Sequence, residues 1–154
     1  MKTRVLMVCL GNICRSPIAE GILRDRVQKE GLDIETDSAG TSSFHVGEKP
    51  DSRMRAAALK NGIDISDLRA RQFVVSDFDE FDIIYAMDRS NYNNIIALAR
   101  NAEDEAKVRM ILNESNPGMN YEVPDPYYGG DQGFQDVIDM LNDAMDVVIQ
   151  KING

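Results

Sequence analysis

The sequence predicts one α/β domain built on a four-stranded parallel sheet with helices on both faces. Short apolar segments alternate along the chain with longer segments whose apolar residues recur at helical spacing. Strands separated by helices are typical of parallel sheets joined by right-handed crossovers. With 154 residues, 43% of them hydrophobic, and no repeat or low-complexity run, the chain is long enough to bury one core. We therefore expect residues 1–154 to form a single domain.

The first strand is the clearest, because four consecutive apolar residues from Val5 to Val8 indicate burial on both faces of a sheet. The other apolar segments are short and are bounded by polar residues or glycine. The expected strands are residues 3–8, 34–37, 83–86 and 108–112.

The helices follow from apolar spacing and from residues that start or stop helices. The last is the most distinct, because its apolar residues form one stripe from Phe134 to Ile152. Gly31 is the expected stop of the first helix, and Asp51 or Ser52 the expected cap of the second, which ends at Gly62. The expected earlier helices are residues 17–30, 51–59 and 90–99, with a single turn at 76–81.

A short loop joins the first strand to the first helix and carries the most informative residues of the chain. Cys9 stands where the buried strand ends, and Arg15 where the helix begins. Ser16 suits the N-cap and Pro17 the first helical position. Because N–H groups at a helix start point toward the same side as the positive end of the helix dipole, this loop is predicted to bind an anion beside a thiol.

The C-x5-R-S pattern of this loop matches what transfer of a phosphoryl group requires. Cys9 supplies a nucleophile, and Arg15 a planar group that holds two phosphate oxygens. A thiol pKa falls to roughly 3.5–7.5 at helix N-termini or beside cations, and Ser16 is positioned to donate its hydroxyl to the thiolate. Gly11 and Asn12 tolerate the left-handed backbone that a loop around an anion requires, although an ordinary turn predicts the same residues.

Composition narrows the classes of partner and of chemistry. The net charge of −9 argues against nucleic acid, and nothing favours a membrane surface. Two cysteines five positions apart form no disulfide framework, and the N-terminus has no signal peptide, so cytoplasm is expected. His45, the only histidine, lies in a polar loop, which disfavours a cysteine protease, and a zinc site would lack a ligand.

Five motifs in the same order along nearly the whole chain resemble those of the low-molecular-weight protein tyrosine phosphatases. The resemblance implies a flavodoxin-like three-layer sandwich with strand order 2-1-3-4. It also implies two-step hydrolysis of phosphotyrosine through a phospho-cysteine, with no metal and no cofactor. The motifs are C-L-G-N-I-C-R-S-P from Cys9, S-A-G-T from Ser38, R-A-R-Q from Arg69, A-M-D from Ala86 and D-P-Y-Y-G from Asp125.

The resemblance implies roles for matching residues. Cys9 would be the nucleophile, Arg15 the phosphate clamp and Asp125 the general acid, while Ser38 supports Asn12. The flanking prolines independently hold Asp125 in an extended segment. Inorganic phosphate, vanadate or sulfate would occupy the same site as the substrate phosphate. The implied phosphate-binding loop comprises Leu10, Gly11, Asn12, Ile13, Cys14, Arg15 and Ser16.

The implied substrate rim consists of Ile13, Phe44, Tyr127 and Tyr128. Related protein-arginine phosphatases tend to carry Thr at the first of these positions and Phe after the D-P pair. An apolar side chain and aromatic walls suit a phenyl ring better than a guanidinium. Leu68 stands where many family members have His, so the hydrogen bond of that His is absent here.

Two alternatives and one regulatory hypothesis remain open at this point. Arsenate reductases of the same fold need a further pair of cysteines, and this chain has only Cys9 and Cys14. A protein-arginine phosphatase is the other alternative. Cys14 is also a candidate redox partner that traps oxidised Cys9 as a disulfide.

Overall fold

In the computed structural model, residues 2–153 are described, apart from the side chain of Tyr128. Four parallel strands form one sheet in the order β2-β1-β3-β4, as expected. The strands are β1 (Thr3–Cys9), β2 (Ile34–Gly40), β3 (Ile83–Ala86) and β4 (Val108–Met110).

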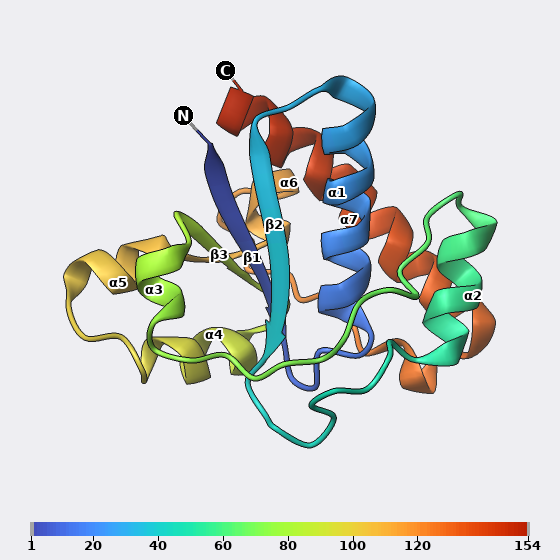
Figure 1. Cartoon of the computed structure of the whole chain (residues 1–154), viewed down its shortest axis with the longest axis horizontal. Coiled ribbons are helices and arrows are strands. Elements are labelled where there is room, and N and C mark those ends of the chain that lie inside the picture. The colour runs from blue at the N-terminus through green and yellow to red at the C-terminus, as the bar shows by residue number, and fades with distance from the viewer. Residues whose placement is uncertain (1, 154) are drawn as a thin grey trace.

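Helices cover both faces of this sheet, which gives three layers (Figure 1). Four helices lie on one face: α1 (Arg15–Glu30), α2 (Ser52–Lys60), α6 (Leu112–Ser115) and α7 (Gly130–Asn153). Three others lie on the opposite side: α3 (Asp77–Glu80), α4 (Arg89–Ile96) and α5 (Ala102–Lys107). Within residues 2–153, no helix is both long and apolar enough to cross a membrane.

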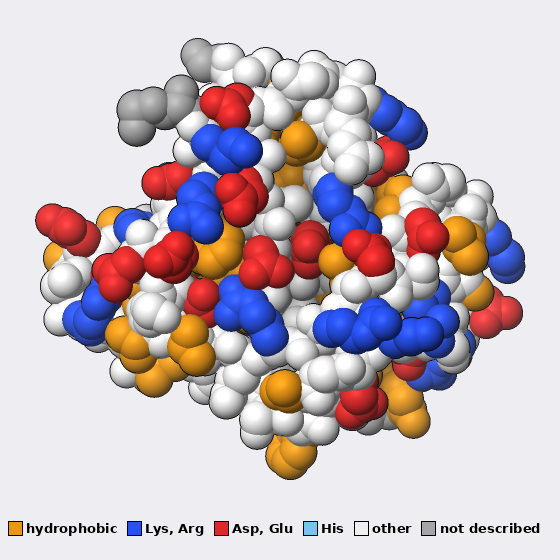
Figure 2. All heavy atoms as spheres, viewed as in Figure 1, with side chains coloured by type: hydrophobic (Ala, Val, Ile, Leu, Met, Phe, Trp, Pro, Cys, Tyr) orange, Lys and Arg blue, Asp and Glu red, His pale blue; other side chains and the backbone are white. Residues whose placement is uncertain are grey.

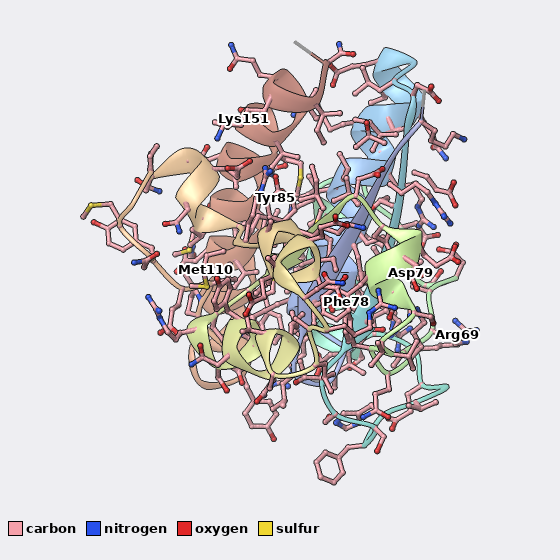
Figure 3. The ribbon with its side chains drawn as sticks, turned by 90° about the vertical axis from the view of Figure 1, so that its left-hand side faces the viewer. Arg69, Phe78, Asp79, Tyr85, Met110 and Lys151 are labelled. Atoms are coloured by element: carbon pink, nitrogen blue, oxygen red, sulfur yellow. The ribbon has the colours of Figure 1, made fainter. Side chains whose placement is uncertain are left out.

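The sheet separates two hydrophobic cores, one on each of its faces. The central strand β1 contributes side chains to both, because successive side chains of a strand point to opposite faces. Val5 and Met7 are fully buried against α1 and α7. Leu6 and Val8 are fully buried in the opposite core, together with Phe78 of α3. Figure 3 looks onto this second side of the molecule and labels Phe78 and Met110, which belong to that core.

Several boundaries differ from those expected, each for a local reason. The first helix begins at Arg15 with Cys14 at its N-cap position, so Ser16 is not the cap and Pro17 is not the first helical residue. Strand β2 extends through Gly40, because it pairs with β1 along its whole length. Helix α4 is capped by the Asp88 side chain, which accepts a hydrogen bond from Asn91 N–H, so the helix begins at Arg89, one residue before the expected start.

Helices α5 and α6 were not expected from apolar spacing, because each is too short to show a periodic stripe. A cap signal for α5 is nevertheless present, since the Asn101 side chain accepts from Asp104 N–H. The expected strand at 108–112 is shorter, because Leu112 already belongs to α6.

Strand pairing positions the loop after β1 at the carboxyl edge of the sheet, where parallel α/β sheets bind ligands. Cys9, the last residue of β1, pairs with Gly40, the last residue of β2. The loop after β1 and the long loop after β2 therefore lie side by side, at the lower edge of Figure 1.

Candidate active site

The loop between β1 and α1 curls with its main-chain donors unpaired. Within the part of the chain that the structure describes, no main-chain N–H from Leu10 to Cys14 donates a hydrogen bond to a protein atom. Asn12 has a left-handed φ of 56° at the turn of the loop. Gly40 is required beside it, because a Cβ there would lie 2.7 Å from the carbonyl oxygen of Leu10. A loop with unpaired N–H groups at a helix start is suited to hold an anion.

Asn12 fixes the shape of the loop through both ends of its buried amide. Its Oδ1 accepts a hydrogen bond from Arg71 N–H at 3.0 Å, which sets the orientation of the amide. Its Nδ2 donates to the hydroxyls of Ser16 at 2.8 Å and Ser38 at 2.9 Å. Ser38 in turn donates to the carboxylate of Glu20 at 2.6 Å. The expected contact between Asn12 and Ser38 is therefore present, and it continues to a glutamate that sequence reasoning missed.

Ser16 lies beside the thiol rather than at a helix cap. Its Oγ is 3.0 Å from Cys9 Sγ, and both residues are buried. Because the hydroxyl already accepts from Asn12, its own proton is left for Cys9 or for the carbonyl of Ala39, which is 3.5 Å away. The sulfur is the nearer of the two and, as a thiolate, is the stronger acceptor, so Ser16 is placed to stabilise a thiolate at Cys9.

The guanidinium of Arg15 is held in place by two hydrogen-bond acceptors from later parts of the chain. Its Nη1 donates to Asp88 Oδ2 at 2.8 Å and to the carbonyl of Val123 at 3.0 Å, and the residue is 7% exposed. Burial lowers the pKa of the guanidinium, but the negative charges of Cys9 and Asp88 outweigh burial, so its pKa is raised. Arg15 is thus a fixed positive charge. The bracing role of Asp88 was missed, although the A-M-D motif that contains it was noted.

Cys9, Cys14, Arg15 and Asp125 line one cavity of about 520 Å³. The nucleophile, the phosphate clamp and the general acid that the sequence suggested are therefore brought to one cavity. Figure 2 shows hydrophobic side chains projecting from the lower edge of the molecule, below the loop that follows β2. In that loop, Phe44 is 85% exposed and Val46 is 56% exposed.

Asp125 stands at the start of a short 3-10 turn, η1 (Pro126–Tyr128). Its Oδ1 accepts a hydrogen bond from Tyr127 N–H at 2.9 Å, so the carboxylate caps its own turn. Pro126 occupies the first position of that turn, where its missing N–H costs nothing. This local capping holds the carboxylate on the wall of the cavity.

Three of the four expected rim residues line the cavity. Ile13, Phe44 and Tyr127 do so, and Tyr127 is 62% exposed at the mouth. The side chain of Tyr128 lies outside what the structure describes. His45 also lines the cavity, and its Nδ1 is 3.0 Å from Glu48 Oε2.

Asp51 and Arg53 are lining residues that sequence reasoning did not assign to the site. Asp51 caps α2, donates its N–H to the carbonyl of Ile13 at 2.6 Å and pairs with Arg53 at 3.0 Å. The guanidinium of Arg53 lies 4.8 Å from the ring centre of Tyr127 and 5.0 Å from that of Phe134. The pair therefore connects the anion loop with the turn that bears the acid. The only sequence signal was the cap pattern at Asp51.

Cys14 is half-buried beside Cys9, and both thiols are free. Burial raises the pKa of Cys14, and the negative charge of Cys9 adds to this, so Cys14 stays a thiol at neutral pH. Their expected redox pairing stays a prediction. Among the described residues, no group of three or more His, Cys, Asp or Glu side chains is arranged to hold a metal ion.

The two arginines of the R-A-R-Q motif differ from each other. Arg71 pairs with Asp37 and Asp77. Arg69 instead donates to two main-chain carbonyls, those of Ser66 and Leu68. Leu68 packs its side chain against the core that contains α1 and α7.

Comparisons with known proteins agree with this geometry. Residues 4–154 match the family model described as low molecular weight phosphotyrosine protein phosphatase. A low molecular weight phosphotyrosine protein phosphatase of Schizosaccharomyces pombe is 46% identical over 143 residues, which cover 91% of this chain and 90% of the relative. The human protein of the same name is 39% identical over 136 residues, covering 86% of this chain and 85% of the relative.

A solved protein tyrosine phosphatase of Entamoeba histolytica, with Hepes in its active site, superimposes with a TM-score of 0.91 at 41% identity, over 99% of this chain and 97% of that one.

Proposed function

Because the chain belongs to the low molecular weight phosphotyrosine protein phosphatase family, we propose that it hydrolyses phosphotyrosine in proteins through a phospho-cysteine on Cys9. The observation that carries the residue assignment is the single cavity shared by Cys9, Arg15 and Asp125, with the unpaired N–H groups of the loop. Together they supply a nucleophile, a clamp for the equatorial oxygens and a proton donor.

In the first step, the thiolate of Cys9 attacks phosphorus in line with the phenolic oxygen. The P–O bond to tyrosine breaks, and Asp125 gives its proton to the leaving phenolate. The N–H groups from Leu10 to Cys14 and the guanidinium of Arg15 bind the three equatorial oxygens, on which charge spreads in the transition state. Asp88 and the Val123 carbonyl keep that guanidinium in place.

In the second step, water attacks the phosphorus of phospho-cysteine while the carboxylate of Asp125 takes a proton from that water. The P–S bond breaks, inorganic phosphate forms, and the electron pair returns to sulfur. The hydroxyl of Ser16, 3.0 Å from Cys9 Sγ, donates to the thiolate as it departs. No metal, oxidant or further cofactor is needed to balance either step.

The mouth of the cavity supports tyrosine as the phosphorylated residue. Its aromatic and apolar wall includes Ile13, Phe44 and Tyr127, which suits a flat phenyl ring. A Drosophila arginine phosphatase shares the fold, with a TM-score of 0.90 at 31% identity. That likeness does not favour the alternative activity here, nor does any relative named above favour arsenate reduction.

The test compares phosphotyrosine, phosphoserine and phosphoarginine peptides of one sequence, with the wild type and with Cys9→Ser. We expect phosphotyrosine to have the highest kcat/KM, and Cys9→Ser to show no measurable turnover while still binding vanadate. Faster hydrolysis of phosphoarginine would overturn the substrate assignment. Measurable hydrolysis by Cys9→Ser would overturn the assignment of Cys9 as the nucleophile.

We also propose that the protein works in the cytoplasm as a single phosphatase domain. Its two cysteines are both free, which fits a reducing compartment.

A further inference from the structure

A buried carboxylate lies at the far end of the hydrogen bonds that lead away from the thiol. Glu20, on the second turn of α1, is 6% exposed and takes no part in the chemistry described above. A buried ionisable side chain is costly unless it is hydrogen-bonded. Glu20 accepts a hydrogen bond from the hydroxyl of Ser38 at 2.6 Å, so it is joined to the network that reaches Cys9.

The direction of each hydrogen bond in that network is fixed by Asn12. Its Oδ1 accepts from the main chain of Arg71, so both of its N–H groups must donate, one to Ser16 and one to Ser38. Each hydroxyl then accepts one bond and has one proton left to give. Ser38 gives its proton to Glu20, and Ser16 gives its proton to Cys9 when Cys9 is a thiolate, which can only accept.

From this geometry we propose that Glu20 is a positioning residue for the catalytic thiol, acting through Ser38, Asn12 and Ser16. As an acceptor, Glu20 holds the hydroxyl of Ser38 turned away from Asn12, which leaves an oxygen lone pair for the amide. When both N–H groups of the Asn12 amide donate, one to Ser38 and one to Ser16, the amide keeps Ser16 oriented toward the thiolate. The proposal rests on the proposed function, because it assigns to Ser16 the stabilisation of that thiolate.

The strength of the hydrogen bond from Ser38 to Glu20 depends on the charge of Glu20. A hydrogen bond to a carboxylate is roughly twice as strong as one to a neutral carboxylic acid. Burial raises the pKa of the Glu20 carboxyl to about 7, although the hydrogen bond from Ser38 opposes burial. The carboxylate therefore forms across the neutral range, and the hold on Ser38 tightens as the pH rises through it.

Three charged groups face Glu20 from the elements around it. Asp37, on β2, and Asp67, in the connection after α2, repel a negative charge and raise its pKa. Arg24, one turn further along α1, lowers it. Asp37 and Asp67 are themselves paired, with Arg71 and Arg24 respectively, which limits their effect. Leu68, also in that connection, is uncharged.

Glu20→Gln tests the charge, because glutamine keeps an oxygen acceptor of the same shape. The rate kcat is measured with p-nitrophenyl phosphate from pH 5 to pH 9 for both proteins, and their ratio is plotted. Groups common to both proteins cancel in that ratio. We expect the ratio of wild type to variant to rise about threefold to tenfold between pH 6 and pH 8 at little-changed KM. Glu30→Gln, an acid-to-amide change at the exposed end of the same helix, should give a flat ratio.

The route from Glu20 through Ser38 is tested by measuring the effect of Glu20→Gln on kcat, over the same pH range, in a Ser38→Ala background. If Glu20 acts through Ser38, the Glu20→Gln change there should have no pH-dependent effect. A second readout without substrate is the rate of Cys9 alkylation by iodoacetate, followed by mass mapping. Its pH dependence should shift in Glu20→Gln and in Ser38→Ala, but not in Glu30→Gln.

A flat ratio for Glu20→Gln would refute the proposal, and an equal rise in the Ser38→Ala background would refute the path through Ser38. Should Glu20→Gln not yield folded protein, the alkylation profile of Ser38→Ala decides, and an unshifted profile overturns the proposal. Hydrolysis by Cys9→Ser would instead overturn the proposed function. With Cys9→Ser inactive and the Glu20→Gln ratio flat, only the role of Glu20 falls.

Discussion

At the scale of single residues, Asp125 is the group whose role depends most on local geometry. It is held on the cavity wall by capping Tyr127 N–H. Among the described residues, the one other carboxylate that lines the cavity is Asp51, which is paired with Arg53. Asp125 is therefore the carboxylate of the cavity wall that is available for proton transfer to a leaving oxygen.

We expect Asp125→Asn to slow aryl phosphates in proportion to how poor their leaving group is. General acid catalysis contributes about 10²–10⁴-fold, so alkyl-substituted phenyl phosphates should lose that much in kcat, and p-nitrophenyl phosphate much less. The measurement is the slope of log kcat against the pKa of the leaving phenol. Asp131→Asn, at the start of α7, is the matched control. A loss of equal size for all leaving groups would contradict the assignment.

Residue identity at the loop could be predicted from the sequence, because the C-x5-R-S spacing and its strand and helix context are local. The partners of those residues could not. Asp88, Glu20 and Arg53 contact the site from positions far along the chain or on the buried side of a helix, and their immediate sequence does not indicate which residues they contact. Ser16 shows the same limit, since a cap pattern and a thiolate partner look alike in sequence.

At the scale of elements, the site depends on how the start of α2 meets the turn η1. Asp51 and Arg53 at the start of α2 bridge the carbonyl of Ile13 to the rings of Tyr127 and Phe134. One rigid helix start thus sets the distance between the anion loop and the acid. Capping predicted the start of α2, but the stacking that gives it this function is a tertiary contact.

Arg53→Ala should loosen η1 and so misplace Asp125. Each cation–π contact at an exposed site is worth about 0.5–1 kcal/mol, so we expect kcat/KM for phosphotyrosine peptides to fall about fivefold to thirtyfold. Arg53→Lys should recover part of this loss, because lysine keeps the charge but not the planar stacking. Lys60→Ala, at the other end of α2, is the control. Unchanged kcat/KM in Arg53→Ala would separate α2 from catalysis.

At the scale of the whole molecule, buried charged groups connect the layers. Glu114 of α6 accepts from the hydroxyl of Tyr85 on β3 at 2.7 Å and pairs with Lys151 of α7 at 2.9 Å. Figure 3 labels Tyr85 and Lys151 at the two ends of this connection. The α/β class was predictable, because apolar alternation and crossover rules act over the whole chain, and the strand order was implied by the family resemblance. These cross-layer pairs were not, since they join residues distant in sequence.

Glu20 gives the folded state an unusual dependence on pH. Burial raises its pKa from 4.5 to about 7 in the folded protein, so between these values the folded state binds more protons than the unfolded state. The free energy of unfolding therefore falls as the pH rises through this range, and the cost is fully present above pH 7. The effect of Asp51 on the free energy of unfolding has the opposite sign. Hydrogen bonds and the charge of Arg53 outweigh burial and lower the pKa of Asp51, so its stabilising contribution is lost only in acid.

Glu20→Gln should consequently be more stable than the wild type at pH 8 and nearly equal to it at pH 5. Each pH unit between the two pKa values is worth at most about 1.4 kcal/mol, so the advantage of the variant should grow by about 2 kcal/mol from pH 5 to pH 8. Urea unfolding at the two pH values measures this, and Asp51 and the other carboxylates cancel because both proteins share them. An advantage that does not grow with pH would mean that the carboxylate forms without cost. If the advantage does grow with pH, the ionised form of Glu20 lowers the stability of the fold. This is the form that we propose positions the thiol, and functional groups are often maintained at such a cost.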